Sequence, residues 1–158
     1  MSFEIERKFL LSHDGWRGLA TGTLYRQGFL STDKERVVRV RIAGDRGSLT
    51  IKGLTRGAKR REFEYEIPLD EAALLLDELC HQPLIEKHRY CIPHGQHMWE
   101  VDEFIGENAG LLIAEVELSA EDESVELPDW VGQEVTEDHR YANASLVSNP
   151  YRRWSTEG

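Results

Sequence analysis

The chain has 158 residues, enough for one domain of ordinary size with a buried core. Its formal net charge of -10 excludes the basic surface of a general nucleic-acid-binding protein, and no apolar run approaches the roughly 18 residues of a membrane span. The N-terminus also lacks the basic and apolar stretches of a secretion signal. We therefore expect a single domain over residues 1–158, with no nucleic-acid or membrane partner and with its last few residues either ordered or frayed.

Alternating polar and apolar residues predict eight β-strands. In "FEIERKFL", residues 3–10, Glu4, Glu6 and Lys8 share one face of a strand, and apolar side chains occupy most positions between them. The eight strands are expected near residues 2–11, 24–31, 35–43, 47–54, 61–67, 84–92, 96–104 and 111–119. "GDRG" at 44–47 and "PHG" at 93–95 predict turns. Little helix separates these strands, which favours a mostly antiparallel sheet.

Two helices are expected beside the strands. The clearer one spans residues 70–80, with Asp70 as its N-cap and with Leu75, Leu76 and Leu79 as its apolar side. The second lies between residues 141 and 148. The apolar side of the first helix must cover part of the sheet.

The cysteines and histidines are too scattered for a metal or redox motif. Cys80 and Cys91 are the only cysteines and lack a CxxC spacing. His94 and His97 lie in "PHGQH", which is typical of a hairpin turn with solvated side chains. Two free thiols and the absence of a secretion signal favour a cytoplasmic protein.

A closed barrel removes the exposed edges that an open sheet of this size would have to protect. The expected fold is α+β and predominantly β: an eight-stranded antiparallel closed barrel with a few covering helices. Its outward face would be apolar, covered by the helices and by a partner subunit if the protein forms a homodimer. Its lumen would be charged, which is the reverse of an ordinary small barrel.

The charged lumen suggests the class of ligand. The expected carboxylates are Glu4, Glu6, Glu62, Glu64, Glu66, Glu100, Asp102, Glu115 and Glu117, and the expected bases are Lys8, Arg39, Arg41, Lys52, Lys87 and Arg89. Ionised groups are not kept away from bulk water without partners. The bases suit a polyanion, and the surplus carboxylates suit Mg²⁺ or Mn²⁺. A metal-chelated polyphosphate satisfies both sets, and a purely structural network of salt bridges is the alternative.

The motifs resemble a known family. "EIERKFL" is similar to the ExExK signature of the CYTH, or triphosphate tunnel metalloenzyme, superfamily. The further blocks occur in the family's order: "RQGFLS" at 26–31, "VVRVRI" at 37–42, "LTIKG" at 49–53, "REFEYEIP" at 61–68, "IEKHRY" at 85–90, "WEVDEF" at 99–104, "AEVEL" at 114–118 and "VTEDHRYANASL" at 135–146. ExExK alone carries little weight because Glu and Lys are common, whereas eight further blocks in order are specific.

The resemblance implies an eight-stranded tunnel that acts on triphosphates with Mg²⁺ or Mn²⁺. The implied metal ligands are Glu4, Glu6, Glu115, Glu117 and Asp102, of which Asp102, like Glu64, would either bind the metal directly or contact its ligands. The implied phosphate-binding residues are Lys8, Arg39, Arg41, Lys52, Lys87 and Arg89. Lys87 would contact the phosphate being transferred or its leaving group, and Glu117 or Glu64 would accept a proton from the attacking water. Many relatives carry Lys where this chain has His139, to which we assign no role.

The expected reaction is metal-dependent hydrolysis of inorganic tripolyphosphate to pyrophosphate and phosphate, as in a short bacterial-type inorganic triphosphatase. A class IV adenylate cyclase or a thiamine triphosphatase would use nearly the same tunnel. A non-catalytic polyphosphate or nucleotide sensor is the alternative from another class of protein. The many carboxylates argue against a sensor, since a binder of anions needs bases more than metal ligands.

Overall fold

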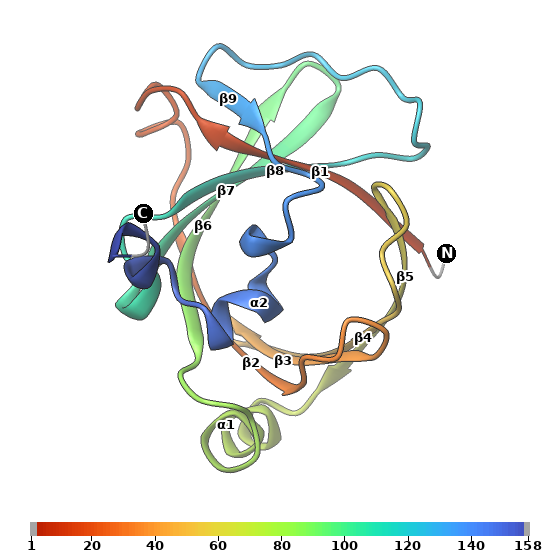
Figure 1. Cartoon of the computed structure of the whole chain (residues 1–158), viewed down its shortest axis with the longest axis vertical. Helices are drawn as coiled ribbons and strands as arrows, with labels where there is room; N and C mark the ends of the chain where they lie inside the picture. Colours follow the sequence, from red (N-terminus) through yellow and green to blue (C-terminus); the bar gives the residue numbers. More distant parts are fainter. Residues whose placement is uncertain (1–2, 157–158) are drawn as a thin grey trace.

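The computed structural model describes residues 3–156, which form a ring of antiparallel strands seen nearly end-on in Figure 1. The elements in chain order are β1 (Phe3–Leu11), β2 (Thr23–Ser31), β3 (Val37–Ala43), β4 (Arg46–Lys52), β5 (Lys59–Ile67), α1 (Leu69–Glu78), β6 (Ile85–His94), β7 (His97–Ile105), η1 (Gly106–Asn108), β8 (Leu112–Glu117), β9 (Val131–Glu134), η2 (His139–Tyr141), α2 (Asn143–Ser148) and η3 (Tyr151–Thr156). The predicted second helix is confirmed as α2. Residues 1, 2, 157 and 158, which include the end of the tail, lie outside the described part.

The strands close into the predicted eight-stranded antiparallel barrel. Their order is β5-β4-β3-β2-β6-β7-β8-β1, and β1 pairs back onto β5, with Glu4 opposite Arg60. A short ninth strand, β9, pairs with the other end of β1, where Phe9 lies opposite Glu134. This strand was not predicted, because "VGQE" has no alternating apolar residues. Closure leaves β1 and β5 without the free edges that an open sheet would expose.

The apolar core lies outside the barrel wall, as the alternation predicts. Phe9, Trp99 and Val101 point outward from their strands and are buried, in one cluster with Trp16 and Trp130 from the segments that cover the wall. A second buried cluster joins the outer face of β3 to α1. Most of the inward face of the strands is therefore left to charged and polar residues.

Apolar side chains fill one end of the lumen. Phe29, Ile85, Phe104 and Ile113 follow the inward alternation of their strands and belong to one buried cluster with Leu146 of α2. Figure 1 shows α2 within the outline of the ring. The lumen therefore has an apolar floor, above which its polar residues lie.

Two turns differ slightly from the predicted positions. β4 begins at Arg46, so the first turn is limited to residues 44 and 45, and Gly44 has a positive φ of 61°. β6 extends to His94 and β7 begins at His97, so the second turn is residues 95 and 96, with Gly95 at φ 62°. Both histidines are therefore strand ends rather than turn residues. Glycine adopts such φ values without the strain that a Cβ atom causes.

Helix α1 begins one residue earlier than predicted, and its capping differs. Pro68 is the N-cap and makes no side-chain cap, while Asp70 accepts a hydrogen bond from the N–H of Glu71 within the first turn. The prediction that Asp70 is the N-cap is therefore wrong. Pro68 disfavours helical backbone at the residue before it, Ile67, so the helix does not extend into β5.

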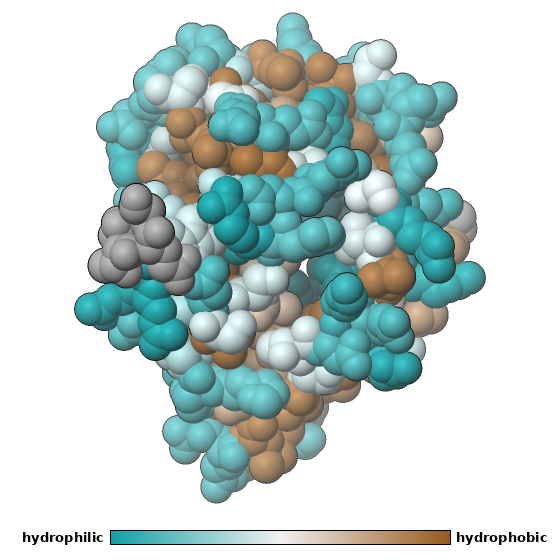
Figure 2. Space-filling view, viewed as in Figure 1, coloured by the Kyte–Doolittle hydropathy of each residue, from teal (hydrophilic) through white to brown (hydrophobic). Residues whose placement is uncertain are grey.

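The buried side of α1 is also rotated from the predicted one. Ala72 and Leu76 are fully buried against Val40 and Ile42 of β3, whereas Leu79 is 66% exposed. The prediction that Leu79 belongs to the apolar side is therefore wrong. Figure 2 shows hydrophobic residues at the end of the molecule where α1 lies. Among residues 3–156, no helix is long and apolar enough to cross a membrane.

The packing of α1 can be tested with two leucines of the same helix. Leu76 is fully buried and Leu74 is 57% exposed. We expect Leu76→Ala to lower the free energy of unfolding by about 2–5 kcal/mol, because it removes buried methyl groups and leaves a cavity. Leu74→Ala is the control and should cost less than about 1 kcal/mol. Urea denaturation of both variants measures the difference, and equal losses would contradict the observed orientation of α1.

Candidate active site

A cavity of about 630 Å³ lies inside the barrel, and its lining is mostly charged. Among residues 3–156, the carboxylates that line it are Glu4, Glu6, Glu62, Glu64, Glu100, Glu115 and Glu117, and the bases are Lys8, Lys34, Arg39, Arg41, Lys52, Arg60, Lys87 and Arg89. All six predicted phosphate-binding residues are in this set. So are four of the five predicted metal ligands. The structure thus brings charged residues from seven of the described strands to one cavity.

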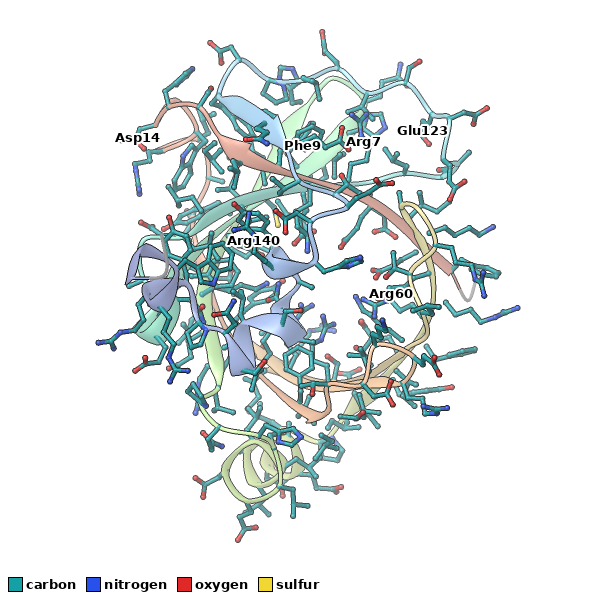
Figure 3. The ribbon with its side chains drawn as sticks, in the orientation of Figure 1. Arg7, Phe9, Asp14, Arg60, Glu123 and Arg140 are labelled. Carbon is teal, nitrogen blue, oxygen red and sulfur yellow. The ribbon has the colours of Figure 1, made fainter. Side chains whose placement is uncertain are left out.

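The lining departs from the predicted set in its balance of charge. Glu66 and Asp102 were expected to face the lumen, but they are not part of the lining, whereas Lys34 and Arg60 are. The expected excess of carboxylates is therefore wrong, and the bases slightly outnumber them. Figure 3 shows Arg60 reaching from β5 toward the inside of the barrel. Its Nε donates to the carbonyl of Gly53 at 3.0 Å, which holds the guanidinium beside the end of β4.

Sequence reasoning missed Arg60 because the predicted strand began at residue 61. Arg60 precedes Glu62 by two positions and so follows the same inward alternation, and β5 in fact begins at Lys59. Extending the predicted strand by two residues would have placed Arg60 in the lumen. Lys34 lies in the loop between β2 and β3, for which no periodic pattern exists.

Lys87 and Arg89 share a buried carboxylate beneath the cavity. The Nζ atom of Lys87 lies 2.7 Å from Oδ2 of Asp102, and Arg89 donates to both Asp102 oxygens at 2.7 and 2.8 Å. Asp102 is fully buried. Burial alone would raise its pKa, but the adjacent Lys87 and Arg89 hold that pKa well below its usual range. Asp102 therefore stays ionised and fixes both bases.

Lys87 is a buried cation with an altered protonation equilibrium. Its side chain is only 1% exposed. Burial lowers the pKa of Lys87 to about 7, although Asp102 opposes the shift, and Arg89 and Arg41 add to it by repulsion. Near neutral pH this group can therefore gain or lose a proton readily.

The two arginines of β3 present donors that the protein does not satisfy fully. The Nε atom of Arg39 is buried and has no hydrogen-bond partner among residues 3–156. Burial lowers the pKa of Arg41 to about 9, and its neighbours Arg39 and Arg89 add to this effect. The guanidinium groups of Arg41 and Arg89 each lie 4.8 Å from the centre of the Tyr25 ring. Buried donors without acceptors favour a ligand that carries several oxygens.

Carboxylates of β1 and β8 form ion pairs with other bases of the lining. Oε1 of Glu4 lies 2.7 Å from Nζ of Lys52; burial alone would raise the pKa of Glu4, but Lys52 holds it below its usual value. Lys8 lies 3.9 Å from Glu115. Although burial alone would raise the pKa of Glu115, nearby bases including Lys8 lower it to about 2.

Glu6 is the exception among the carboxylates. It makes no ion pair within 4 Å among residues 3–156, and burial together with Glu115 and Glu4 raises its pKa to about 8. A proton thus relieves the repulsion in the absence of another cation. A divalent cation bound between Glu6 and its neighbours would relieve the same repulsion.

The carboxylates of β1 and β8 fit Mg²⁺ or Mn²⁺, since both ions prefer carboxylate oxygens as ligands. Within residues 3–156, no three His, Cys, Asp or Glu side chains form a group that could hold a metal ion. The fit is therefore to an ion that takes part of its coordination from water and from phosphate oxygens, as Mg²⁺ usually does.

The segment from η2 to α2 supplies lining residues that the sequence analysis did not select. His139, Ala142, Asn143, Ala144 and Ser145 border the cavity. Asn143 accepts a hydrogen bond from Lys87 at 2.9 Å and another from Gln27. Neither amide residue has a distinctive spacing, so only the fold reveals their proximity.

Comparisons with known proteins cover nearly the whole chain. The family model of the CYTH domain matches residues 2–151. The chain is 52% identical over 154 residues to an inorganic triphosphatase of Acetivibrio thermocellus, which covers 98% of this chain and 99% of that protein. It is 36% identical over 153 residues to an inorganic triphosphatase of Nitrosomonas europaea, covering 91% and 96%. A crystal structure of an inorganic triphosphatase, 32% identical, covers 92% of this chain and 99% of its own with a TM-score of 0.66.

The raised pKa of Glu6 predicts how stability depends on pH in metal-free protein. The folded state holds a proton on Glu6 up to a pKa of about 8, whereas the unfolded carboxyl loses it near 4.5. Its contribution to stability is therefore lost as the pH rises from 5 to 8. The side chain introduced by Glu6→Gln cannot ionise, so the free energy of unfolding of this variant should fall less steeply with pH than that of the wild type. The two slopes should differ by at most about 1.4 kcal/mol per pH unit. Urea denaturation in EDTA measures both slopes, and parallel curves would contradict the prediction.

Proposed function

This chain belongs to the CYTH domain family, and from that premise we propose that it is an inorganic triphosphatase, which hydrolyses tripolyphosphate to pyrophosphate and phosphate inside the barrel. The resemblance seen in the sequence motifs is confirmed by the family match. The observation that carries the proposal is the cavity inside the barrel, whose lining combines bases from β1, β3, β4, β5, β6 and the β2–β3 loop with carboxylates from β1, β5, β7 and β8. Such a lining suits a substrate with many negative oxygens and a divalent cation.

Phosphoryl transfer depends mainly on positioning and on neutralising charge. In the proposal, Lys8, Arg39, Arg41, Lys52, Lys87 and Arg89 bind the phosphate oxygens. The guanidinium groups of Arg39 and Arg41 offer forked donors that match pairs of phosphate oxygens. Lys87 uses two of its three N–H donors on Asp102 and Asn143, so one remains for the substrate.

Glu4, Glu6, Glu115 and Glu117 would hold Mg²⁺ or Mn²⁺ beside the substrate. When bound, the cation would supply Lewis acidity to the phosphate oxygens and to the attacking water. Glu117 and Glu64 are proposed as acceptors of the proton that this water releases. Burial raises the pKa of Glu117 and Glu4 adds to it, which makes Glu117 a stronger base. Glu64 accepts a hydrogen bond from Thr50 at 3.2 Å, which orients its carboxylate.

Asp102 was predicted as a metal ligand, and its contacts support a different role. Both its oxygens are used by Lys87 and Arg89. We therefore propose that Asp102 positions these two bases. A ligand role would require one of its oxygens to leave a buried cation, which is costly.

The alternatives from the sequence are less well supported. A class IV adenylate cyclase or thiamine triphosphatase would share the phosphate-binding lining, but both relatives named above act, by their names, on inorganic triphosphate. A polyphosphate sensor would not need the carboxylates of β1 and β8. The proposal also includes a cytoplasmic location, for which the free thiols of Cys80 and Cys91 are the support.

The proposal also includes a homodimer, and its support is the outer surface of the barrel. Ile51, Phe63 and Tyr65 point outward from β4 and β5 and are 39%, 38% and 55% exposed. Ile51 lies opposite Phe63 in the register of the two strands, so these apolar side chains adjoin. A second subunit packed on this face would remove them from water.

The activity is tested by incubating the protein with tripolyphosphate and Mg²⁺ or Mn²⁺ and following phosphate release. We expect phosphate and pyrophosphate as products by phosphorus NMR, and loss of turnover in EDTA because the phosphate charge is then not neutralised. ATP and thiamine triphosphate, assayed in parallel, should give a lower kcat/KM. Cyclic AMP from ATP, preference for thiamine triphosphate, or binding without turnover would each contradict the proposal in favour of one alternative. Equal rates in EDTA would contradict the metal role.

The role of Lys87 is tested by Lys87→Ala. A cation at the transferring phosphate interacts more strongly as charge shifts in the transition state, so kcat should fall on the order of 100-fold or more. Lys59→Ala is the matched control, because Lys59 is exposed on β5, its ammonium lies over the ring of Phe3, and it does not line the cavity. Steady-state kinetics measure kcat and KM for both variants. A raised KM with unchanged kcat would assign Lys87 to substrate capture alone.

A further inference from the structure

A chain of amide hydrogen bonds connects two of the phosphate-binding bases through α2. Arg41 donates from Nε to Oε1 of Gln27 at 2.9 Å. Gln27 donates from Nε2 to Oδ1 of Asn143. Lys87 donates from Nζ to the same Oδ1 at 2.9 Å. The order is therefore Arg41 to Gln27 to Asn143, with Lys87 meeting Asn143 from the other side.

The direction of this chain is fixed by its two ends. Arginine and lysine side chains are donors only, so each requires an oxygen from the amide it touches. The amide oxygen of Gln27 must face Arg41, and its NH₂ group must then face Asn143. The oxygen of Asn143 must face both Lys87 and Gln27, because rotation of the amide by 180° would place donors against donors.

The NH₂ group of Asn143 is consequently turned away from all three residues. No hydrogen bond among residues 3–156 uses its Nδ2 atom, and that atom is not among the buried polar atoms without a partner. Asn143 lines the cavity. Two donor hydrogens of a residue that lines the cavity are therefore left for a ligand.

The backbone around Asn143 keeps this orientation. Asn143 is the first residue of α2, and Leu146 in the same helix is fully buried in the cluster that forms the apolar floor. Lys87 rests above this floor, with Nζ 5.3 Å from the ring of Phe104. A linear triphosphate that extends along the cavity to this floor would place a terminal phosphate beside Lys87 and Asn143.

We propose that Asn143 is a substrate-binding residue, whose Nδ2 donates to an oxygen of the terminal phosphate that Lys87 also binds. The inference rests on the proposed function only in taking tripolyphosphate as the ligand. Gln27 is the positioning residue that directs the Asn143 amide. The donors of Asn143 add no charge, so they bind phosphate without increasing the repulsion among Lys87, Arg41 and Arg89.

The rival interpretation is that Asn143 only holds Lys87 in place, and a double-mutant cycle separates the two. Affinity for tripolyphosphate is measured by titration calorimetry in EDTA, so that turnover does not interfere, for the wild type, Asn143→Ala, Lys87→Ala and the double variant. A residue that acts only through Lys87 has no effect once Lys87 is gone. We expect Asn143→Ala to weaken binding on the order of 10-fold in both backgrounds, because a hydrogen bond to a charged group is lost.

Asn143→Asp provides a second variant that keeps the oxygen accepting from Lys87 and Gln27 but replaces the NH₂ group with a negative oxygen. It should bind tripolyphosphate more weakly than Asn143→Ala, because the carboxylate repels the phosphate. Asn149→Ala, at the end of α2, is the control and should match the wild type, and thermal unfolding of each variant checks that it is folded.

The inference is overturned if Asn143→Ala binds like the wild type, if its effect vanishes in the Lys87→Ala background, or if Asn143→Asp binds better than Asn143→Ala. These outcomes concern binding alone. Failure of the wild type to release phosphate from tripolyphosphate would instead contradict the proposed function, so the two failures are distinguishable.

Discussion

The charges inside the barrel must neutralise one another, and the rest of the structure depends on this condition. An ion taken out of bulk water loses several kcal/mol of hydration unless partners replace it. Within residues 3–156, the eight bases and seven carboxylates of the lining meet this condition largely as pairs, among them Lys52 with Glu4. Where a partner is missing, as at Glu6, the pKa shifts instead. A polyanion supplies acceptors for the bases, and a divalent cation that enters with it would offset part of its charge beside the carboxylates, so the lining suits both better than either alone.

A charged lumen also determines where the apolar residues go. Strand alternation sends every second side chain outward, so a barrel with a polar interior needs its hydrophobic core on the outside of the wall. Covering segments therefore carry much of the stability: α1 buries Leu76 against β3, and the segment before β9 contributes Trp130. At the apolar floor, the lumen itself is part of the core. Substrate-binding and stabilising residues thus occupy opposite faces of the same strands.

The repeating two-residue pattern made most of this molecule predictable from sequence. It placed Glu4, Glu6 and Lys8 on one face, and closure followed from the number of strands. The pattern missed single residues at strand ends where the predicted strand began too late in the sequence, as at Arg60. Asp102 lies at an inward position of the alternation, as predicted. Its burial beneath the lining depends on the contacts that Lys87 and Arg89 make with both of its oxygens. Asn143 and Gln27 lie 116 positions apart and meet only after folding, so no local pattern could join them.

Closure between β1 and β5 has a consequence for how the chain acquires its structure. β1 is the first strand along the chain, yet it pairs with β5 and with β8, where Lys8 lies opposite Glu115. Pairings between segments so distant in sequence form slowly, because the entropy of closing the loop must be overcome before the contacts stabilise it. During synthesis, β1 has no partner of its own until β5 is available, and its place beside β8 waits until most of the chain has been made. In that interval the strand that carries Glu4 and Glu6 is an unpaired edge, and its alternate charges keep such an edge from joining other chains.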